Sequence, residues 1–463
     1  MLNLNKKQDL ILNGKMSKVI LILAGPIMLN NIIQSIYNIT DTYFVGQLGS
    51  EQMAAMTLVF PVIFFFLSIG MGINIAGTSL ISQYIGNNEK DSATKVAGEV
   101  ITVAILISVF LGFPGAIAAP TIIKLMGGSN EILKYSIDFL RPMLFGMPTL
   151  FLFLAFTAIK QGQGDTVTPM KYTAFSVTLN IILDPIFIFV LDFGIQGAAF
   201  ATILARGIFA IYAVYTLFFH ENGIKISKKD LLLDSNVIKL IKVGVPSSIG
   251  QSMAAFGFMF LNGFIIAFGH TTLAAFGIGN RINSLILMPA MGIGNALATI
   301  VGQNLGADQI DRAKNAVKTS SILSTVFLLI GGGIFFPFIP QILKLFSDDP
   351  LVISQGITYL RLITLSLPLM GFFQIFVGTF QGSGHTIFAM ILMIGRLWAL
   401  RLPMILIFRQ YTNWGSNSVW YAMVLSNALT CVVGYIIYLS GRWEEKVIDN
   451  KAAKKAENIL AKK

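Results

Sequence analysis

The sequence is poor in cysteine, histidine and charge. It has one cysteine, Cys431, so no internal disulfide can form. Its three histidines lie far apart in the sequence, which argues against a structural or catalytic zinc site. Only 12% of the 463 residues are charged, whereas a soluble domain carries about 25%. Most of the surface therefore does not face water.

Long apolar runs lie between the sparse charges. Hydrophobic residues make up 55% of the chain, and runs such as 101–119 and 322–339 are largely apolar and contain no charged residue. A helix needs about 20 apolar residues to cross a bilayer, whereas membrane strands alternate over about 10 residues. We therefore predict an all-α integral membrane protein with twelve transmembrane helices. Their approximate limits are 18–40, 52–82, 94–118, 136–159, 170–191, 196–219, 239–266, 272–300, 316–345, 356–380, 386–408 and 418–440.

Lysine and arginine are distributed unevenly among the connections. The net charge is +11, and most basic residues fall in the N-terminal segment, the stretch 220–236, the C-terminal tail and every second connection. The positive-inside rule then places both termini in the cytoplasm and explains the basicity without nucleic acid. No small-residue cleavage site follows the first apolar run, so we expect no removable signal peptide. We expect a monomer in the cytoplasmic membrane.

The two halves of the chain match each other at a constant offset of 220 positions. Six helices is an even number, so both halves enter the membrane in the same sense, as a parallel repeat. Two such lobes enclose a site near the midplane and rock against each other, which gives alternating access. Matched pairs include Pro26 with Pro246, Gly49 with Gly269, Gln83 with Gln303, Gly86 with Gly306, and the segment 161–166 with 381–386.

The long polar stretch after the sixth helix marks the boundary between the halves. We predict an N-lobe at 1–219, a cytoplasmic linker at 220–238, a C-lobe at 239–441 and a basic cytoplasmic tail at 442–463.

Two carboxylates lie in predicted spans of the N-lobe. Asp41 ends the first helix, and Asp184 lies four residues after Asn180, on the same helix face. Acidic residues inside a membrane are costly and mark functional sites. Thr202, one helix later, can add a hydroxyl. An intramembrane carboxylate can carry a proton, and these oxygens also suit Na⁺, so both coupling ions remain open.

The second half has no matching acids. The repeat partners of Asp41 and Asp184 are Leu261 and Met404, and no Asp or Glu occurs between Asp349 and Glu444. The predicted cation site is therefore one-sided. Four arginines also fall within predicted spans, at 206, 281, 396 and 401. We interpret them as snorkelling or helix-end partners, with contact to an anionic substrate as the alternative.

Several of these segments resemble the multidrug and toxic compound extrusion (MATE) family. The resemblance rests on Tyr37-Asn38-x-x-Asp41-x-x-Phe44-x-Gly46, on Leu179 to Pro185, on Gly194-x-x-Gly197, and on the Gln-Gly-x-Gly turn at 161 and its copy at 381. It covers nearly the whole chain and includes exporters of the NorM, MepA and DinF types. It implies export of organic cations driven by inward H⁺ or Na⁺, with no enzymatic activity and no other cofactor.

The resemblance also assigns roles to residues. It implies a cation-coupling site at Asp41, Asn180, Asp184 and Thr202, helix bending at Pro26, and cavity-lining positions at Gln34 and Tyr37, to which we add Asn38.

Methionine suits an adaptable drug cavity because its side chain is flexible and polarisable. The chain has 19 methionines. We expect Met288 and Met291 to line the substrate cavity, although ordinary packing explains most methionines individually.

Three other functions compete with this interpretation. A flippase for lipid-linked oligosaccharides or lipids belongs to the same superfamily and would use Arg396 and Arg401. An intramembrane aspartyl protease would use the GxGD signature at Gly162 to Asp165, but that segment lies at a predicted turn. A passive channel has little use for one-sided titrating groups.

Overall fold

The computed structural model describes residues 4–128, 130–219 and 223–448. The first residues of the predicted linker, 220–222, and most of the predicted tail, 449–463, lie outside the described residues. The described residues form helices and no strand. Within these ranges, ten helical segments are long and apolar enough to cross a membrane, and two bent helix pairs raise the number to as many as 12. The prediction of twelve transmembrane helices is confirmed.

The N-lobe contains the first six spans. They are α2 (Met16–Gly46), α3 (Ser50–Gly86), α4 (Lys90–Leu125), the pair α5 (Asn130–Phe145) and α6 (Met147–Gly162), α7 (Val167–Pro185) with η1 (Ile186–Val190), and α8 (Gly194–Phe219).

The C-lobe contains the other six. They are α9 (Asn236–Ile266), α10 (His270–Gly306), α11 (Ile310–Phe335) with η2 (Phe336–Phe338) and α12 (Ile339–Lys344), the pair α13 (Pro350–Leu365) and α14 (Leu367–Gly382), α15 (Thr386–Ile394) with η3 (Gly395–Arg401) and α16 (Leu402–Tyr411), and α17 (Asn417–Leu439), which the turn η4 (Arg442–Glu444) follows.

Bends divide the fourth and tenth predicted spans, 136–159 and 356–380, into two helices each. α5 and α6 meet at 49°, and α13 and α14 meet at 53°. Pro148 and Pro368 lie in the first turn after each bend, where proline is tolerated because that backbone N–H has no helical partner. The two prolines are 220 positions apart, so the bends belong to the repeat.

The backbone repeats at the same offset as the sequence. Gly49 and Gly269 have φ of 136° and 110°, and Gly164 and Gly384 have φ of 76° and 83°. Asn88 and Asp308, which are not glycines, share the left-handed conformation at 59° and 58°. Matching strained turns of this kind indicate that the two lobes are copies of one fold.

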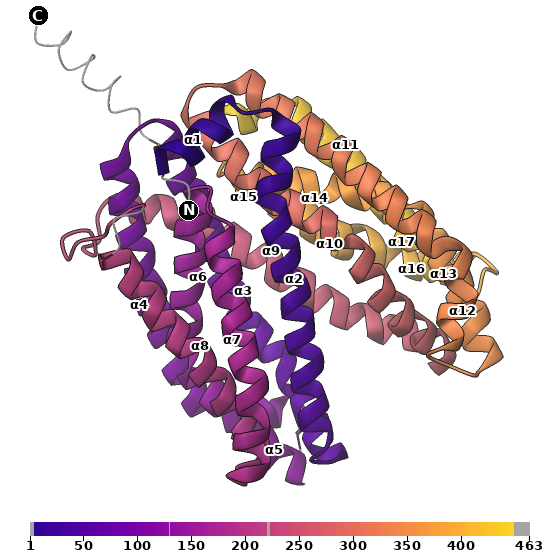
Figure 1. Ribbon diagram of the computed structural model, residues 1–463. Coiled ribbons are helices and arrows are strands. Elements are labelled where there is room, and N and C mark those ends of the chain that lie inside the picture. The colour runs from indigo at the N-terminus through magenta and orange to yellow at the C-terminus, as the bar shows by residue number, and fades with distance from the viewer. Residues whose placement is uncertain (1–3, 129, 220–222, 449–463) are drawn as a thin grey trace, which may run out of the picture.

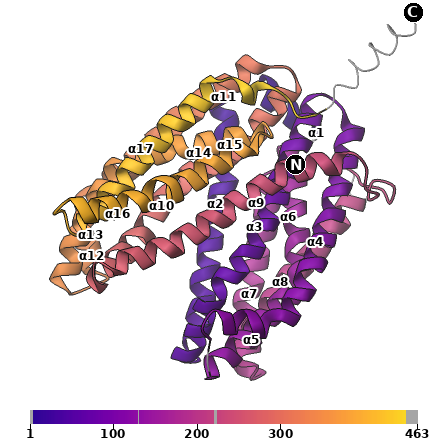
Figure 2. The ribbon, with the colours of Figure 1, turned by 180° about the vertical axis from the view of Figure 1, so that it is seen from behind.

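The two lobes meet at one end of the molecule and diverge at the other (Figures 1 and 2). We call these the closed end, which carries α1 (Leu4–Asn13), and the open end. α1 was not predicted, because its sequence is polar. Its Gln8 donates to the carbonyl of Ile85, and Lys7 pairs with Asp165 at 2.8 Å. α1 is therefore bound to the closed end.

The first helix of each lobe is shared between both lobes. The first half of α2, from Met16 to Ile27, packs in a core with α10 of the C-lobe, whereas Val45 at its end lies in the N-lobe core. α9 does the reverse, since Leu240 and Val243 pack in the N-lobe and Leu261 packs in the C-lobe. The two helices thus cross between the lobes.

Paired polar contacts join the lobes at the closed end. Gln83 donates to the carbonyl of Ser383 at 3.0 Å, and its repeat partner Gln303 donates to the carbonyl of Gly162 at 2.9 Å. Ser79 and Thr299, also 220 apart, each donate to a carbonyl of the opposite lobe at 3.1 Å. The backbones approach so closely that a Cβ on Gly86 would lie 2.0 Å from the carbonyl oxygen of Gln303.

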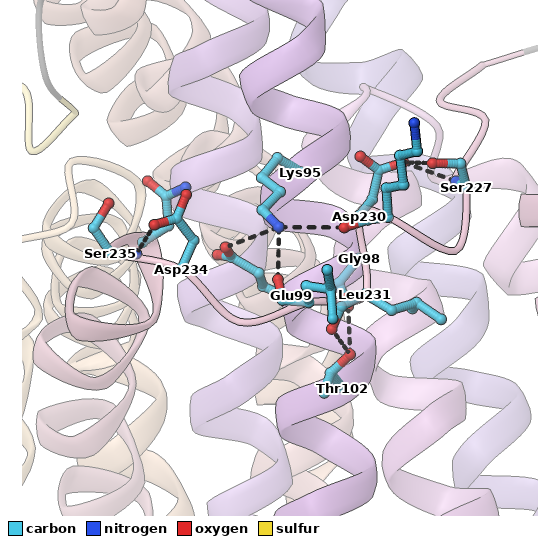
Figure 3. A network of polar contacts seen from close by, with 12 residues as sticks. Lys95, Gly98, Glu99, Thr102, Ser227, Asp230, Leu231, Asp234 and Ser235 are labelled. Atoms are coloured by element: carbon cyan, nitrogen blue, oxygen red, sulfur yellow. Dashed lines mark hydrogen bonds and ion pairs between the residues drawn. The ribbon is translucent and has the colours of Figure 1, made fainter.

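The described part of the linker packs along α4 (Figure 3). Lys95 donates to the carbonyl of Leu232 at 2.6 Å, and Thr102 donates to that of Leu231 at 2.7 Å. Gly98 permits this approach, because a Cβ there would lie 2.3 Å from the carbonyl oxygen of Asp230. The linker is therefore held against the N-lobe and is not a free tether.

Candidate functional site

Three helices of the N-lobe each contribute two side chains four residues apart. α2 carries Tyr37 and Asp41, α7 carries Asn180 and Asp184, and α8 carries Thr202 and Arg206. A spacing of four places both members of a pair on one helix face. The three faces converge, and the structure brings together all four residues of the predicted cation-coupling site.

Hydrogen bonds connect this cluster. The hydroxyls of Tyr37 and Thr202 lie 3.1 Å apart, and the amide of Asn180 donates to Asp184 Oδ1 at 2.9 Å. The same amide lies 3.4 Å from the Thr202 hydroxyl, so Thr202 bridges α2 and α7. The carboxylate of Asp184 is fully buried, and that of Asp41 is 5% exposed.

Three oxygens of the cluster have no hydrogen-bond partner among the described residues: Oδ1 of Asp41, Oδ1 of Asn180 and Oδ2 of Asp184. Buried oxygens of this kind are costly unless something fills the site. The two carboxylates also repel each other electrostatically. A proton or a small cation between them would satisfy these oxygens.

The part of the chain that the structure describes has no group of three His, Cys, Asp or Glu side chains that could hold a metal ion. A sodium ion here would therefore need the amide and hydroxyl oxygens as well as the carboxylates. Oxygen donors are the type that such hard cations prefer.

Arg206 was interpreted from the sequence as a snorkelling residue, but it lies at the site. Its guanidinium stacks on Tyr37, 4.9 Å from the ring centre, and attracts Asp41. The sequence could have identified Arg206, because it lies four residues after Thr202, which was already assigned to the site. The cluster thus has two acidic groups and one basic group.

A cavity of about 350 Å³ lies within the N-lobe beside this cluster. Gln34 lines it, as predicted, together with Arg206, which connects it to the carboxylates. Polar side chains that the sequence did not single out also line it, and they include Asn30, Asn31, Thr173 and Ser176. Tyr37 is buried at the cluster itself.

A second cavity, of about 470 Å³, lies between the lobes. It is lined by α2 and α3 on one side and by α9 and α10 on the other. Its walls are largely aromatic and methionine side chains, and they include Met53, Met56, Phe60, Phe256 and Met259.

Three predicted cavity residues are placed elsewhere. Met288 is half-buried on α10, and Met291 is 41% exposed on the same helix. Asn38 is exposed on α2, and its carbonyl accepts from Thr42. None of the three contributes to the two cavities described above.

Pro26 lies inside α2, which continues unbroken from Met16 to Gly46. Proline weakens a helix because it removes one hydrogen bond. Pro26 lies at the end of the segment that packs against the C-lobe. It therefore occupies the part of α2 where the helix passes from one lobe to the other.

The GxGD segment forms a turn at the closed end. α6 ends at Gly162, and Gly164 has a φ of 76°. Burial alone would raise the pKa of Asp165, but the ion pair with Lys7 and hydrogen bonds from Thr168 hold it below its ordinary value. Asp165 thus has a local structural role in this turn.

Comparisons with known proteins agree with this architecture. A family model described as MatE matches residues 26–186 and 246–407. The chain is 28% identical to the probable multidrug resistance protein YoeA of Bacillus subtilis (strain 168), over 91% of this chain and 93% of that protein. It is 25% identical to a protein named FAD transporter of Shewanella oneidensis, over 94% of this chain and 97% of that protein.

A solved structure described as the outward-facing conformation of a multidrug resistance MATE family transporter is 28% identical. It superimposes with a TM-score of 0.87 and covers 92% of this chain and 96% of that chain.

Proposed function

The chain belongs to the MatE family of multidrug transporters, and we propose that it exports organic cations by antiport against H⁺ or Na⁺. The observation that carries the proposal is the pair of buried carboxylates, Asp41 and Asp184, beside a cavity in the N-lobe. Each carboxylate has one buried oxygen without a hydrogen-bond partner among the described residues, and acids inside a membrane persist where they bind something.

Competition for these carboxylates couples the two fluxes. An organic cation in the N-lobe cavity is attracted by the ionised pair. A proton or sodium ion on Asp41 and Asp184 removes that attraction, so the two ligands oppose each other's binding. Arg206 strengthens the competition, because it repels an organic cation once the carboxylates are neutralised.

Alternating access follows if the two lobes rock between two arrangements. The arrangement described here is closed at the end that carries α1. We place this end in the cytoplasm, on the positive-inside argument. The cavity between the lobes then opens outward, towards the side where a drug is released and a coupling ion enters. The site would function in the cytoplasmic membrane, in a monomer, without chemical catalysis.

The coupling energy sets a limit on the gradient. One charge that crosses 100 mV gains about 2.3 kcal/mol, and one pH unit adds about 1.4 kcal/mol per proton. Exchange of one proton for one monovalent drug cation moves no net charge, so the pH term alone then sustains a drug gradient of about tenfold per pH unit. The electrical term contributes only when more than one proton enters per drug cation.

The test is transport of an organic cation in proteoliposomes under an imposed proton gradient or, separately, a sodium gradient. Asp41→Asn and Asp184→Asn are compared with the wild type. Asp192→Asn is the matched control, because Asp192 is an exposed carboxylate just after η1, with a φ of 55° that asparagine also adopts.

We expect one gradient to drive transport in the wild type and the control, and in neither site variant. Transport that ignores both gradients, or that survives both substitutions, would remove the coupling role from these carboxylates.

Transport of an anionic or lipid-linked substrate, as in a flippase, is the second candidate. Arginines favour it, because Arg206 lines the N-lobe cavity and Arg281 lines the cavity between the lobes. A relative of this chain is named FAD transporter. In the same proteoliposomes, competition by an anionic nucleotide and not by organic cations would favour this candidate.

A further inference from the structure

The C-lobe has a buried polar centre of its own, made of two arginines. Arg396 and Arg401 lie on η3, and their side chains are 7% and 2% exposed. In a π-helix, the backbone hydrogen bonds join residues five apart, and this is the spacing of Arg396 and Arg401. The π-helical turn thus brings both guanidinium groups to the interior of one lobe, where they repel each other.

Neutral groups surround both arginines. Arg401 donates to Ser426 Oγ at 3.1 Å and to Asn427 Oδ1 at 2.7 Å, both on α17. Arg396 donates to the sulfur of Met370 and lies over the ring of Phe373, 4.3 Å from its centre. No ion-pair partner of either arginine is present in residues 4–128, 130–219 and 223–448.

This arrangement leaves two positive charges without a counter-charge. Guanidinium stays protonated in proteins, and a buried unpaired charge costs several kcal/mol. The sequence has no Asp or Glu between Asp349 and Glu444, so the spans that surround the arginines cannot supply a carboxylate. The compensating charge must come from outside the chain.

Unpartnered donors point to the same conclusion. Among the described residues, Arg396 Nε, the Tyr359 hydroxyl and Trp420 Nε1 are buried and have no hydrogen-bond partner. The rings of Tyr359 and Trp420 lie 4.5 Å apart, and Tyr359 interacts electrostatically with Arg401. N–H and O–H donors beside two cations are the surroundings that an anion requires.

We propose that Arg396 and Arg401 bind a small inorganic anion, chloride, inside the C-lobe. A monovalent ion suits the site because burying a divalent anion costs much more desolvation free energy. Arg401 lies at the centre of these groups, because it interacts electrostatically with both Arg396 and Tyr359, and the Tyr359 ring contacts that of Trp420.

The site corresponds to the cation cluster of the N-lobe with the charges reversed. The span that carries Asp184 in the N-lobe is repeated by the span that carries Arg396 and Arg401, and α8 is repeated by α17. Arg206 matches Ser426 at the offset of 220. One copy of the fold thus presents buried negative charge and the other presents buried positive charge.

The experiment compares the thermal stability of the purified full-length protein in chloride with that in gluconate at equal ionic strength. We expect chloride to raise the melting temperature of the wild type by about 2–4 °C, with saturation. Arg401→Gln should remove this increase. Arg409→Gln is the control, because Arg409 is an exposed arginine of the same lobe, and it should keep the increase.

Asn427→Asp is the decisive variant, since it only replaces the side-chain amide nitrogen of Asn427 by a carboxylate oxygen of similar size. Its carboxylate would accept from Arg401 at the position of Asn427 Oδ1 and supply the missing counter-charge internally. We expect its melting temperature in gluconate to match that of the wild type in chloride, and chloride to add nothing. This variant decides the matter even if Arg401→Gln does not fold.

A wild type with equal melting temperatures in both salts would overturn the proposal. So would a full chloride effect in Arg401→Gln or in Asn427→Asp. Bromide in crystals provides an independent check, because its anomalous signal should appear at Arg401 in the wild type and be absent in Asn427→Asp.

Discussion

The hydroxyl groups of Tyr37 and Thr202 connect the helices that carry the buried carboxylates Asp41 and Asp184 of the N-lobe. Thr202 receives contacts from both sides, from the Tyr37 hydroxyl at 3.1 Å and from the Asn180 amide at 3.4 Å. Thr202, Tyr37 and Asn180 are uncharged, yet their contacts fix the distance between the helices that carry Asp41 and Asp184. Geometry at this cluster therefore depends on neutral groups as much as on the carboxylates.

Tyr37→Phe should weaken the response to the coupling ion. The substitution keeps the ring over which Arg206 stacks and removes only the hydroxyl, which contributes about 1 kcal/mol. We expect the half-saturating concentration of the coupling ion to rise roughly fivefold. Tyr43→Phe is the control, because Tyr43 lies on the same helix and is 62% exposed. Equal behaviour of the two variants in proteoliposome transport would contradict the bridging role.

His385 gives the closed end a pH dependence. Burial lowers the pKa of His385, although Glu445 and a hydrogen bond with Ser383 oppose the shift. A histidine whose folded pKa is lowered binds fewer protons when folded, so its stabilising contribution is complete above the unfolded pKa of about 6.5 and is lost as the pH falls below it. We expect the melting temperature to fall between pH 7.5 and 5.5, and to fall less in His385→Gln. The same slope in both proteins would show that other groups titrate.

At the scale of helices, close packing between small residues constrains how the two lobes fit together. Small residues let α3 and α10 approach the opposite lobe, at Gly72 against Ser248 and at Gly292 against Met28. The two contacts are repeats of each other, because Gly72 and Gly292 are 220 positions apart, and so are Met28 and Ser248. Gly86 and Gly306 are paired in the same way. A single added methyl group at these positions reaches backbone or side-chain atoms of the other lobe.

Gly86→Ala should open the closed end. Its Cβ would lie 2.0 Å from a backbone oxygen of α10, and overpacking of this kind costs about 1–3 kcal/mol. The change is measured by labelling an introduced cysteine, Ala76→Cys, with a thiol reagent in a Cys431→Ala background. Ala76 suits this purpose because it is 1% exposed and faces Gly244 of α9. We expect labelling roughly 5–100 times more extensive at early times. Gly25→Ala, whose Cβ has no neighbour within 4 Å, should leave labelling unchanged.

The sequence predicted the spans well because each is long and apolar, and hydrophobicity alone determines that a segment crosses the bilayer. It did not predict α1, whose polar residues become helical only because the closed end offers partners such as the carbonyl of Ile85. It also did not predict the bends that precede Pro148 and Pro368.

Asp41 and Asp184 could be singled out from the sequence because acids are rare in apolar runs, and Asn180 because it lies four residues before Asp184. The full set with Thr202 followed from the family resemblance. The structure brings the four side chains together, and their role in coupling stays a prediction. Arg206 was misread, since an arginine near a helix end has a common structural explanation. The cavity positions of Met288 and Met291 were predicted from side-chain chemistry alone, which does not determine the direction in which a residue points.

At the scale of the whole molecule, the two glutamines of the closed end act as one symmetric latch. Gln83 reaches from the N-lobe to the C-lobe, and Gln303 reaches back. Gln83 also accepts from the backbone N–H of Val447, so the segment after α17 contributes to closure. Neither lobe can separate without breaking both contacts.

Gln83→Ala and Gln303→Ala should each shift the population towards the arrangement that is open at this end. Each loses at least one hydrogen bond of about 1 kcal/mol, so we expect about a fivefold shift for each and about 25-fold for the double variant. Labelling at Ala76→Cys measures the shift, and Gln341→Ala, at an exposed position of α12, is the control. A double variant no different from wild type would exclude the latch.

The exchange of α2 and α9 between the lobes has a consequence for the ancestry of the chain. A half-length ancestor with the same fold would have left the first half of its leading helix without an apolar partner, unless a second copy supplied one. A half-length polypeptide of this fold would therefore need a second copy with swapped helices, in which every ionisable group would occur twice. In a single chain that contains both halves the two copies need not be identical, and here the N-lobe carries the buried acids and the C-lobe the buried arginines.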